Sequence, residues 1–273
     1  MEEKLDIEGR LRIYFPILFE LLGDNKLDWK TITKVFQKKL NEWHRKHELT
    51  GSDIRIEASF YNIITASIQG NQQARNHLDF IQKLFETLLK RLNDSERKLI
   101  LSALFGLLTN MNKMYRNFLG ELCVLNNVKG NTNFILNAVE VPVVPTLPAG
   151  KKIDFDFINP ETKNHLLVEI VNVHLNNVNE WNDEKVHQLL HQKIQGKLNS
   201  TGIKKNDTFQ LIPVFWGSFD ELKRINEFYK TTSIKFQNTS DPVCYASFST
   251  ASEKRKVFWF GTIDSIINKS LNY

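Results

Sequence analysis

Cysteine is scarce in this sequence: among 273 residues there are only Cys123 and Cys244. Each stands between apolar neighbours and neither belongs to a CxxC pair, so two buried, reduced thiols are expected rather than a zinc site or a disulfide framework. No apolar run reaches the ~18 residues of a membrane span. The N-terminus also lacks a basic segment followed by an apolar one. These absences predict a cytoplasmic protein that does not enter the membrane.

Several catalytic motifs are missing as well. We find no Walker loop, no GxGxxG and no GxSxG elbow, so these features give no support to a nucleotide-binding loop or a serine hydrolase. His187 and His191 are four residues apart, but the intervening Gln-Leu-Leu lacks the glutamate of an HExxH zinc motif. A solvated helix face is therefore favoured over a metal shared by the two histidines.

The composition indicates an ordinary globular protein with a basic excess. Apolar residues make up 41% of the chain and include 19 phenylalanines, enough for a substantial core. There are 36 Lys and Arg against 31 Asp and Glu, which gives a net charge of +5. This balance favours an anionic partner such as nucleic acid, although charge alone is a non-specific argument.

The first part of the chain has helical periodicity. One stripe at steps of three and four predicts a helix that begins after Asp28 as its N-cap: Trp29, Ile32, Phe36, Leu40 and Trp43. A second helix is predicted over 75–92, and Ser95 is predicted to cap a third. We therefore expect a helical domain over residues 1–109.

The second part alternates between strands and helices. After a helix at about 110–126, β-branched residues predict strands at 134–144, 153–159 and 165–174, the last two joined by a hairpin turn. Further elements are predicted in the order helix 182–199, strand 208–216, helix 219–229, strands 243–248 and 256–261, and helix 264–271. The expected fold class is mixed α/β (α+β): a central mixed sheet flanked by helices, forming a second domain over 110–273.

Four carboxylates stand at positions where an acidic side chain calls for an explanation. Glu121 lies on the apolar stripe of its helix, where it either pairs with a basic residue or borders a metal site. Asp154 and Asp156 share one face of their strand. If the strand is an outer one, that face is solvated. Otherwise, one of the aspartates points into a cleft. Glu169 interrupts an apolar run that predicts a central strand, which makes a functional role about as plausible as a structural one.

Taken together, these residues resemble the PD-(D/E)XK nuclease superfamily. The order is a helix with Glu121, a second strand with Asp154, a third strand with Glu169, and then an amphipathic helix; the resemblance spans about Arg116 to Tyr273. It implies a restriction-endonuclease-like core in which Asp154 and Glu169 hold Mg²⁺ or Mn²⁺ and Glu121 supports them. Hard oxygen ligands suit these ions. In that family the following helix often turns a glutamine or lysine toward the cleft, and Lys193, Gln195 and Lys197 could match.

The sequence departs from the family pattern in two places. Val171 stands where the family has its lysine, two residues after the glutamate, and Ile153 replaces the proline that often precedes the aspartate. A valine cannot orient or activate a water molecule. Either a lysine reaches in from another element, as Lys193, Lys197 or Lys152 could, or the site cleaves nothing.

Three functional hypotheses follow. The first is a metal-dependent nuclease that hydrolyses phosphodiester bonds in DNA, with RNA and a homodimer as further alternatives. Its nucleic-acid contacts would include Lys34, Lys38, Lys152 and Gln195. The second is a catalytically inactive nuclease-like domain that binds nucleic acid or a protein partner. The third is an unrelated α/β domain whose carboxylates are structural.

Overall fold

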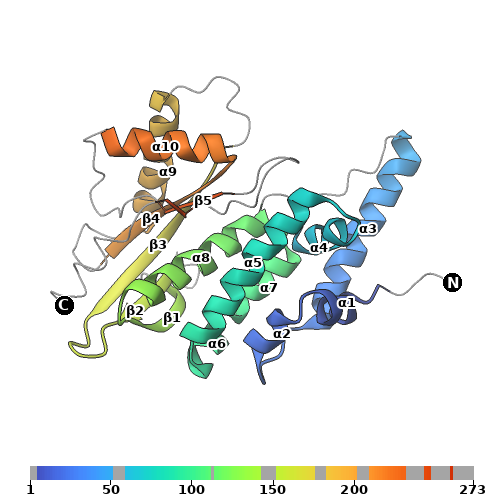
Figure 1. Cartoon of the computed structure of the whole chain (residues 1–273), viewed down its shortest axis with the longest axis horizontal. Helices are drawn as coiled ribbons and strands as arrows, with labels where there is room; N and C mark the ends of the chain where they lie inside the picture. The colour runs from blue at the N-terminus through green and yellow to red at the C-terminus, as the bar shows by residue number, and fades with distance from the viewer. Residues whose placement is uncertain are drawn as a thin grey trace. The chain divides into compact units, whose positions relative to one another are not determined.

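The computed structural model describes residues 5–51, 59–111, 114–142, 152–175, 183–201, 209–231, 243–246 and 259–260. The chain divides into two compact units, Met1–Leu122 and Cys123–Tyr273 (Figure 1). The division falls inside one helix, α8 (Tyr115–Asn131). The boundary expected from the sequence, between residues 109 and 110, lies earlier in the chain. The last helix predicted from the sequence, 264–271, lies outside the described residues.

The first unit is helical, as its periodicity predicts. Its helices are α1 (Ile7–Tyr14), α2 (Ile17–Leu22), α3 (Trp29–Thr50), α4 (Phe60–Ile68), α5 (Gln72–Arg91), α6 (Asp94–Leu99) and α7 (Leu101–Thr109), followed by the first half of α8. Phe15 is buried in the core of this unit. Its ring meets those of Phe60 and Phe85 edge to face, with centroids 5.0 and 5.3 Å apart. Such pairs add to the stabilisation that apolar burial provides.

The start of α3 is as predicted. Asp28 accepts a hydrogen bond from the backbone N–H of Thr31 at 2.9 Å, which satisfies one of the open donors of the first turn.

The predicted cap at Ser95 is wrong. Asn93 caps α6 instead, and its side chain accepts from the backbone N–H of Glu96 while the Glu96 carboxylate accepts from the Asn93 N–H. This reciprocal capping box satisfies two donors at once, which a cap at Ser95 would not do.

The second unit contains a mixed sheet. After α8, the described elements run β1 (Ile135–Pro142), β2 (Lys152–Ile158), β3 (His165–His174), α9 (Asp183–Thr201), β4 (Phe209–Gly217), α10 (Phe219–Thr231), β5 (Val243–Ala246) and β6 (Trp259–Phe260). The strands lie in the order β1-β2-β3-β4-β5-β6. Neighbours are antiparallel except for β3–β4 and β4–β5, which are parallel. The prediction of mixed α/β structure with N-terminal helices is therefore confirmed.

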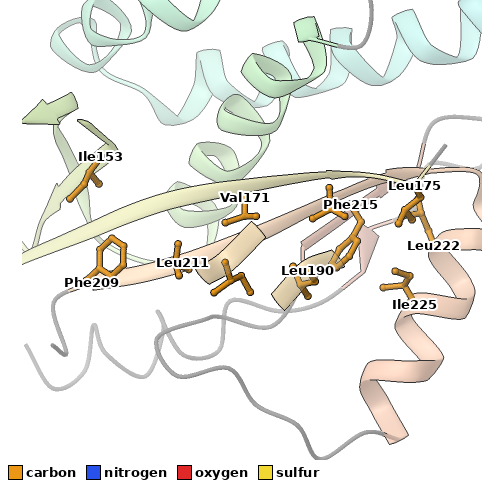
Figure 2. Packing of buried hydrophobic residues seen from close by; sticks show 11 residues of the cluster. Ile153, Val171, Leu175, Leu190, Phe209, Leu211, Phe215, Leu222 and Ile225 are labelled. Atoms are coloured by element: carbon orange, nitrogen blue, oxygen red, sulfur yellow. The ribbon is translucent and has the colours of Figure 1, made fainter. Parts of the chain in front are cut away.

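Helices α9 and α10 cover one face of this sheet. Leu190 and Ile194 of α9, and Leu222 and Ile225 of α10, pack in one buried cluster with alternate residues of the two central strands: Val171 and Val173 in β3, and Phe209, Leu211 and Phe215 in β4 (Figure 2). Strand β4 is buried along its whole length, as expected for a central parallel strand. The face of β3 that carries Val171 is thus the face under α9.

Within the described residues, no helix is both long and apolar enough to cross a bilayer.

Candidate active site

Glu169 is buried at the centre of the sheet. It lies in β3, between β2 and β4, and is only 2% exposed. Side chains alternate along a strand, so Glu169 points to the same side as Val171, the side that α9 covers. The prediction that this strand is central is confirmed.

Asp154 lies beside Glu169, at the place where β2 and β3 stop pairing as a regular ladder. The register runs from Ile158↔His165 to Phe155↔Val168. Beyond this pairing, the backbone N–H groups donate to side-chain carboxylates and not to backbone carbonyls. The Ile170 N–H donates to Asp154 Oδ2 at 2.6 Å, and the Asp154 N–H donates to Glu169 Oε2 at 3.2 Å. The two carboxylates are therefore held together by the backbone of the neighbouring strands.

Lys197 brings a cation to this pair from α9. It follows Ile194 by three residues and so continues the buried stripe of the helix. Its Nζ forms an ion pair with Glu169 Oε1. The Lys197 side chain is 42% exposed whereas that of Glu169 is 2% exposed, so a half-exposed lysine on α9 pairs with a buried carboxylate.

The net charge of the trio depends on whether Asp154 carries a proton. Burial, and then the negative charge of Glu169, raise the pKa of Asp154 to about 7, although Lys197 and the Ile170 N–H act in the opposite direction. With one proton on the pair, the charges of Asp154, Glu169 and Lys197 cancel. When both carboxylates ionise, one negative charge is uncompensated.

The donor set fits a hard divalent cation. Two carboxylates from adjacent strands supply oxygen ligands, and the uncompensated charge of the ionised pair favours a cation. No group of three or more His, Cys, Asp or Glu residues that could hold a metal ion is found in the described part of the chain. Mg²⁺ is often bound by one or two carboxylates together with water and substrate phosphate, so a pair can be sufficient.

The other predicted site residues have different surroundings. Glu121 is half-buried in the part of α8 that belongs to the first unit, and its role beside the pair stays a prediction. Lys152 forms an exposed ion pair with Glu140 of β1, with Nζ and Oε2 2.8 Å apart. Lys193 is half-buried and Gln195 is exposed on α9. No described hydrogen bond or ion pair joins either of them to the carboxylates.

Lys34 and Lys38 are exposed on α3, in the first unit. Their predicted contact with nucleic acid stays a prediction.

Sequence reasoning missed the surroundings of Asp156. Strand β2 is an inner strand, so the alternative of an outer strand with a solvated face is wrong, and Asp156 is 5% exposed. Its carboxylate accepts from Asn137 Nδ2 at 2.7 Å and contacts His165 Nδ1 at 2.8 Å. The predicted hairpin already placed His165 across from the end of β2, which was the signal for this pair.

Comparison with known proteins gives no family assignment. No family model, curated protein or solved structure matches the chain.

Proposed function

We propose that the second unit is a metal-dependent nuclease that hydrolyses phosphodiester bonds in DNA, with Asp154 and Glu169 as the ligands of Mg²⁺ or Mn²⁺. The observation that carries this proposal is the ion pair between Lys197 and Glu169, directly beside Asp154. A buried acidic pair with a lysine from the next helix is what the nuclease hypothesis requires once Val171 occupies the usual lysine position.

The order of elements supports the same proposal. Asp154 lies in the second strand of an antiparallel meander, Glu169 in the third, and Lys197 in the helix that leads to a parallel fourth strand. This is the order of acidic residues and of the following helix that the resemblance to PD-(D/E)XK nucleases implies. We therefore propose a restriction-endonuclease-like core for the second unit.

Each residue of the trio has a distinct part in the proposed chemistry. A bound divalent ion would lower the pKa of a water molecule and neutralise charge on the reacting phosphate. Asp154 and Glu169 hold that ion, and the backbone N–H of Ile170 fixes the orientation of the Asp154 carboxylate. Lys197 supplies the positive charge that the hydrocarbon side chain of Val171 cannot. Val171 is 2% exposed and packed in the apolar cluster under α9.

The test is plasmid cleavage by matched variants. The wild type should nick supercoiled DNA in Mg²⁺ or Mn²⁺. Asp154→Asn and Glu169→Gln should lose at least ~100-fold in rate, and Lys197→Met a comparable factor, because they remove charge that stabilises the transition state. Lys193→Met is the control, since it removes the same charge one turn earlier on α9 and should retain cleavage within a few-fold. Cleavage that survives both carboxylate substitutions contradicts the assignment.

One observation favours the inactive alternative. Without a metal ion, a proton on Asp154 and the ion pair of Lys197 already neutralise the trio. Such a group can stabilise the sheet without catalysis. An inactive domain would bind DNA equally in Mg²⁺ and in EDTA and would cleave none, which distinguishes it from the nuclease.

A further inference from the structure

The pair Asp156–His165 lies on the same face of the sheet as the acidic pair. Asp156 follows Asp154 by two residues on β2, while His165, Leu167 and Glu169 alternate along β3. The register Asp156↔Leu167 puts both sets on one side. Two residues of a strand span about 7 Å and four span about 13 Å. Asp156 therefore lies about 7 Å from Asp154 along β2, and His165 lies about 13 Å from Glu169 along β3, toward the beginning of that strand.

His165 is held in one orientation. Its Nδ1 lies 2.8 and 3.0 Å from the two carboxylate oxygens of Asp156. A carboxylate only accepts, so Nδ1 carries the hydrogen and Nε2 is the ring nitrogen left for a ligand. The His165 side chain is 52% exposed whereas that of Asp156 is 7% exposed. A buried carboxylate therefore holds an imidazole that is open to solvent.

A third strand contributes to this arrangement. The β1–β2 register shifts between Leu136 and Ala138, and Asn137 at this irregularity donates from Nδ2 to Asp156 Oδ2 at 2.7 Å. Bulges re-aim side chains and are common beside active sites. By contrast, the nearby pair Lys152–Glu140 is about half-exposed at both ends. Burying a carboxylate is costly, and a simple surface ion pair does not require it.

We propose that His165 binds a backbone phosphate of the DNA strand on the side of the scissile phosphate that faces the start of β3. This inference rests on the proposed nuclease function. In the imidazolium form, Nε2–H donates to a phosphate oxygen while Asp156 supplies the counter-charge. The DNA strand then passes from the half-exposed Lys197 on α9 toward the exposed His165 at the start of β3. His165 is a positioning residue and takes no part in breaking the bond.

Affinity for DNA tests this inference. Binding of a fluorescein-labelled DNA oligonucleotide is measured by anisotropy with Ca²⁺ in place of Mg²⁺, and cleavage is measured separately in Mg²⁺. His165→Ala should raise Kd about tenfold, as expected for loss of a hydrogen bond to a charged group, and should lower the rate at saturating DNA much less. It should also reduce the salt slope of binding by roughly one unit. His165→Lys, which places an ammonium group at this position, should restore most of the affinity.

Asn164→Ala is the matched control. Asn164 is the exposed neighbour of His165 in the turn, and the hydrogen bonds described for it are made by its backbone. This variant should bind as the wild type does. Thermal unfolding of each variant identifies those that lose structure, and His165→Lys keeps the test valid if His165→Ala is unstable.

The outcomes separate the two proposals. Wild-type affinity in a folded His165→Ala protein overturns the phosphate contact and leaves the nuclease proposal standing. A weakened His165→Ala, together with a wild type that cleaves nothing, supports the contact and overturns the nuclease. A wild type that neither binds nor cleaves DNA overturns both.

Discussion

At the scale of single residues, the main feature is the proton that Asp154 holds near neutral pH. Burial and Glu169 raise its pKa to about 7, whereas an aspartate in the unfolded chain has an ordinary pKa of 3.8. Between these values the folded protein binds a proton that the unfolded chain has released. Stability is therefore highest at low pH for this group and is lost as pH rises through about 7.

This linkage predicts a pH-dependent loss of stability. The free energy of unfolding should fall by roughly 1 kcal/mol between about pH 6 and pH 8 from Asp154 alone. Asp154→Asn resembles the protonated side chain and should lack this part of the pH dependence. Urea unfolding of both proteins across this range, in EDTA, measures the difference. Parallel pH profiles for the two proteins would rule out a raised pKa at Asp154.

At the scale of helices and strands, local rules predicted much of the fold. The N-cap of α3 and the hairpin between β2 and β3 depend on neighbouring residues, so sequence spacing was sufficient for both. The choice between Lys193 and Lys197 was not local. Both lie on the inner side of α9, and which one meets Glu169 depends on how α9 lies along β3. The burial of Asp156 likewise depends on β1, whose irregularity at Asn137 leaves no clear mark in the sequence.

The space around two helical glycines leads to a prediction about packing. A Cβ on Gly106 of α7 would lie 2.3 to 2.6 Å from ring atoms of Phe118 in α8, whereas one on Gly196 of α9 would have no atom within 4 Å. Gly106→Ala should therefore destabilise the protein by about 1–3 kcal/mol through overpacking. Gly196→Ala should stabilise it by up to ~1 kcal/mol, since alanine is the better helix former. Thermal unfolding compares the two, and equal shifts would contradict the close approach at Gly106.

At the scale of the whole molecule, the basic excess includes a stripe along α3. The α3 stripe consists of Lys30, Lys34, Lys38 and Arg45, all exposed. Their spacing places them on one face of the helix, and Ile32 and Phe36 are buried on another. Such a stripe matches a phosphate backbone in charge, as the nuclease proposal requires of some surface of the protein.

Salt dependence tests the α3 stripe. If Lys34 and Lys38 each contact a phosphate, Lys34→Ala/Lys38→Ala should reduce the slope of log K against log salt by about 1.8 for duplex DNA. Affinity should fall for every DNA sequence alike. Lys39→Ala is the control, because Lys39 Nζ already pairs with Glu42 Oε2 at 3.0 Å. A slope that the double variant leaves unchanged would remove α3 from the DNA-binding surface.

The mixed pairing of the sheet also has a kinetic consequence. Asp154 and Glu169 come together when β2 and β3 close across the short turn between Ile158 and His165. Lys197 arrives only when α9 packs on β3, in the longer connection from His174 to Phe209 that the parallel pairing requires. Loop closure costs more entropy as the loop lengthens, so short closures are favoured first. We therefore expect the acidic pair to assemble before its cation during folding, so the trio is complete only once the parallel half of the sheet has formed.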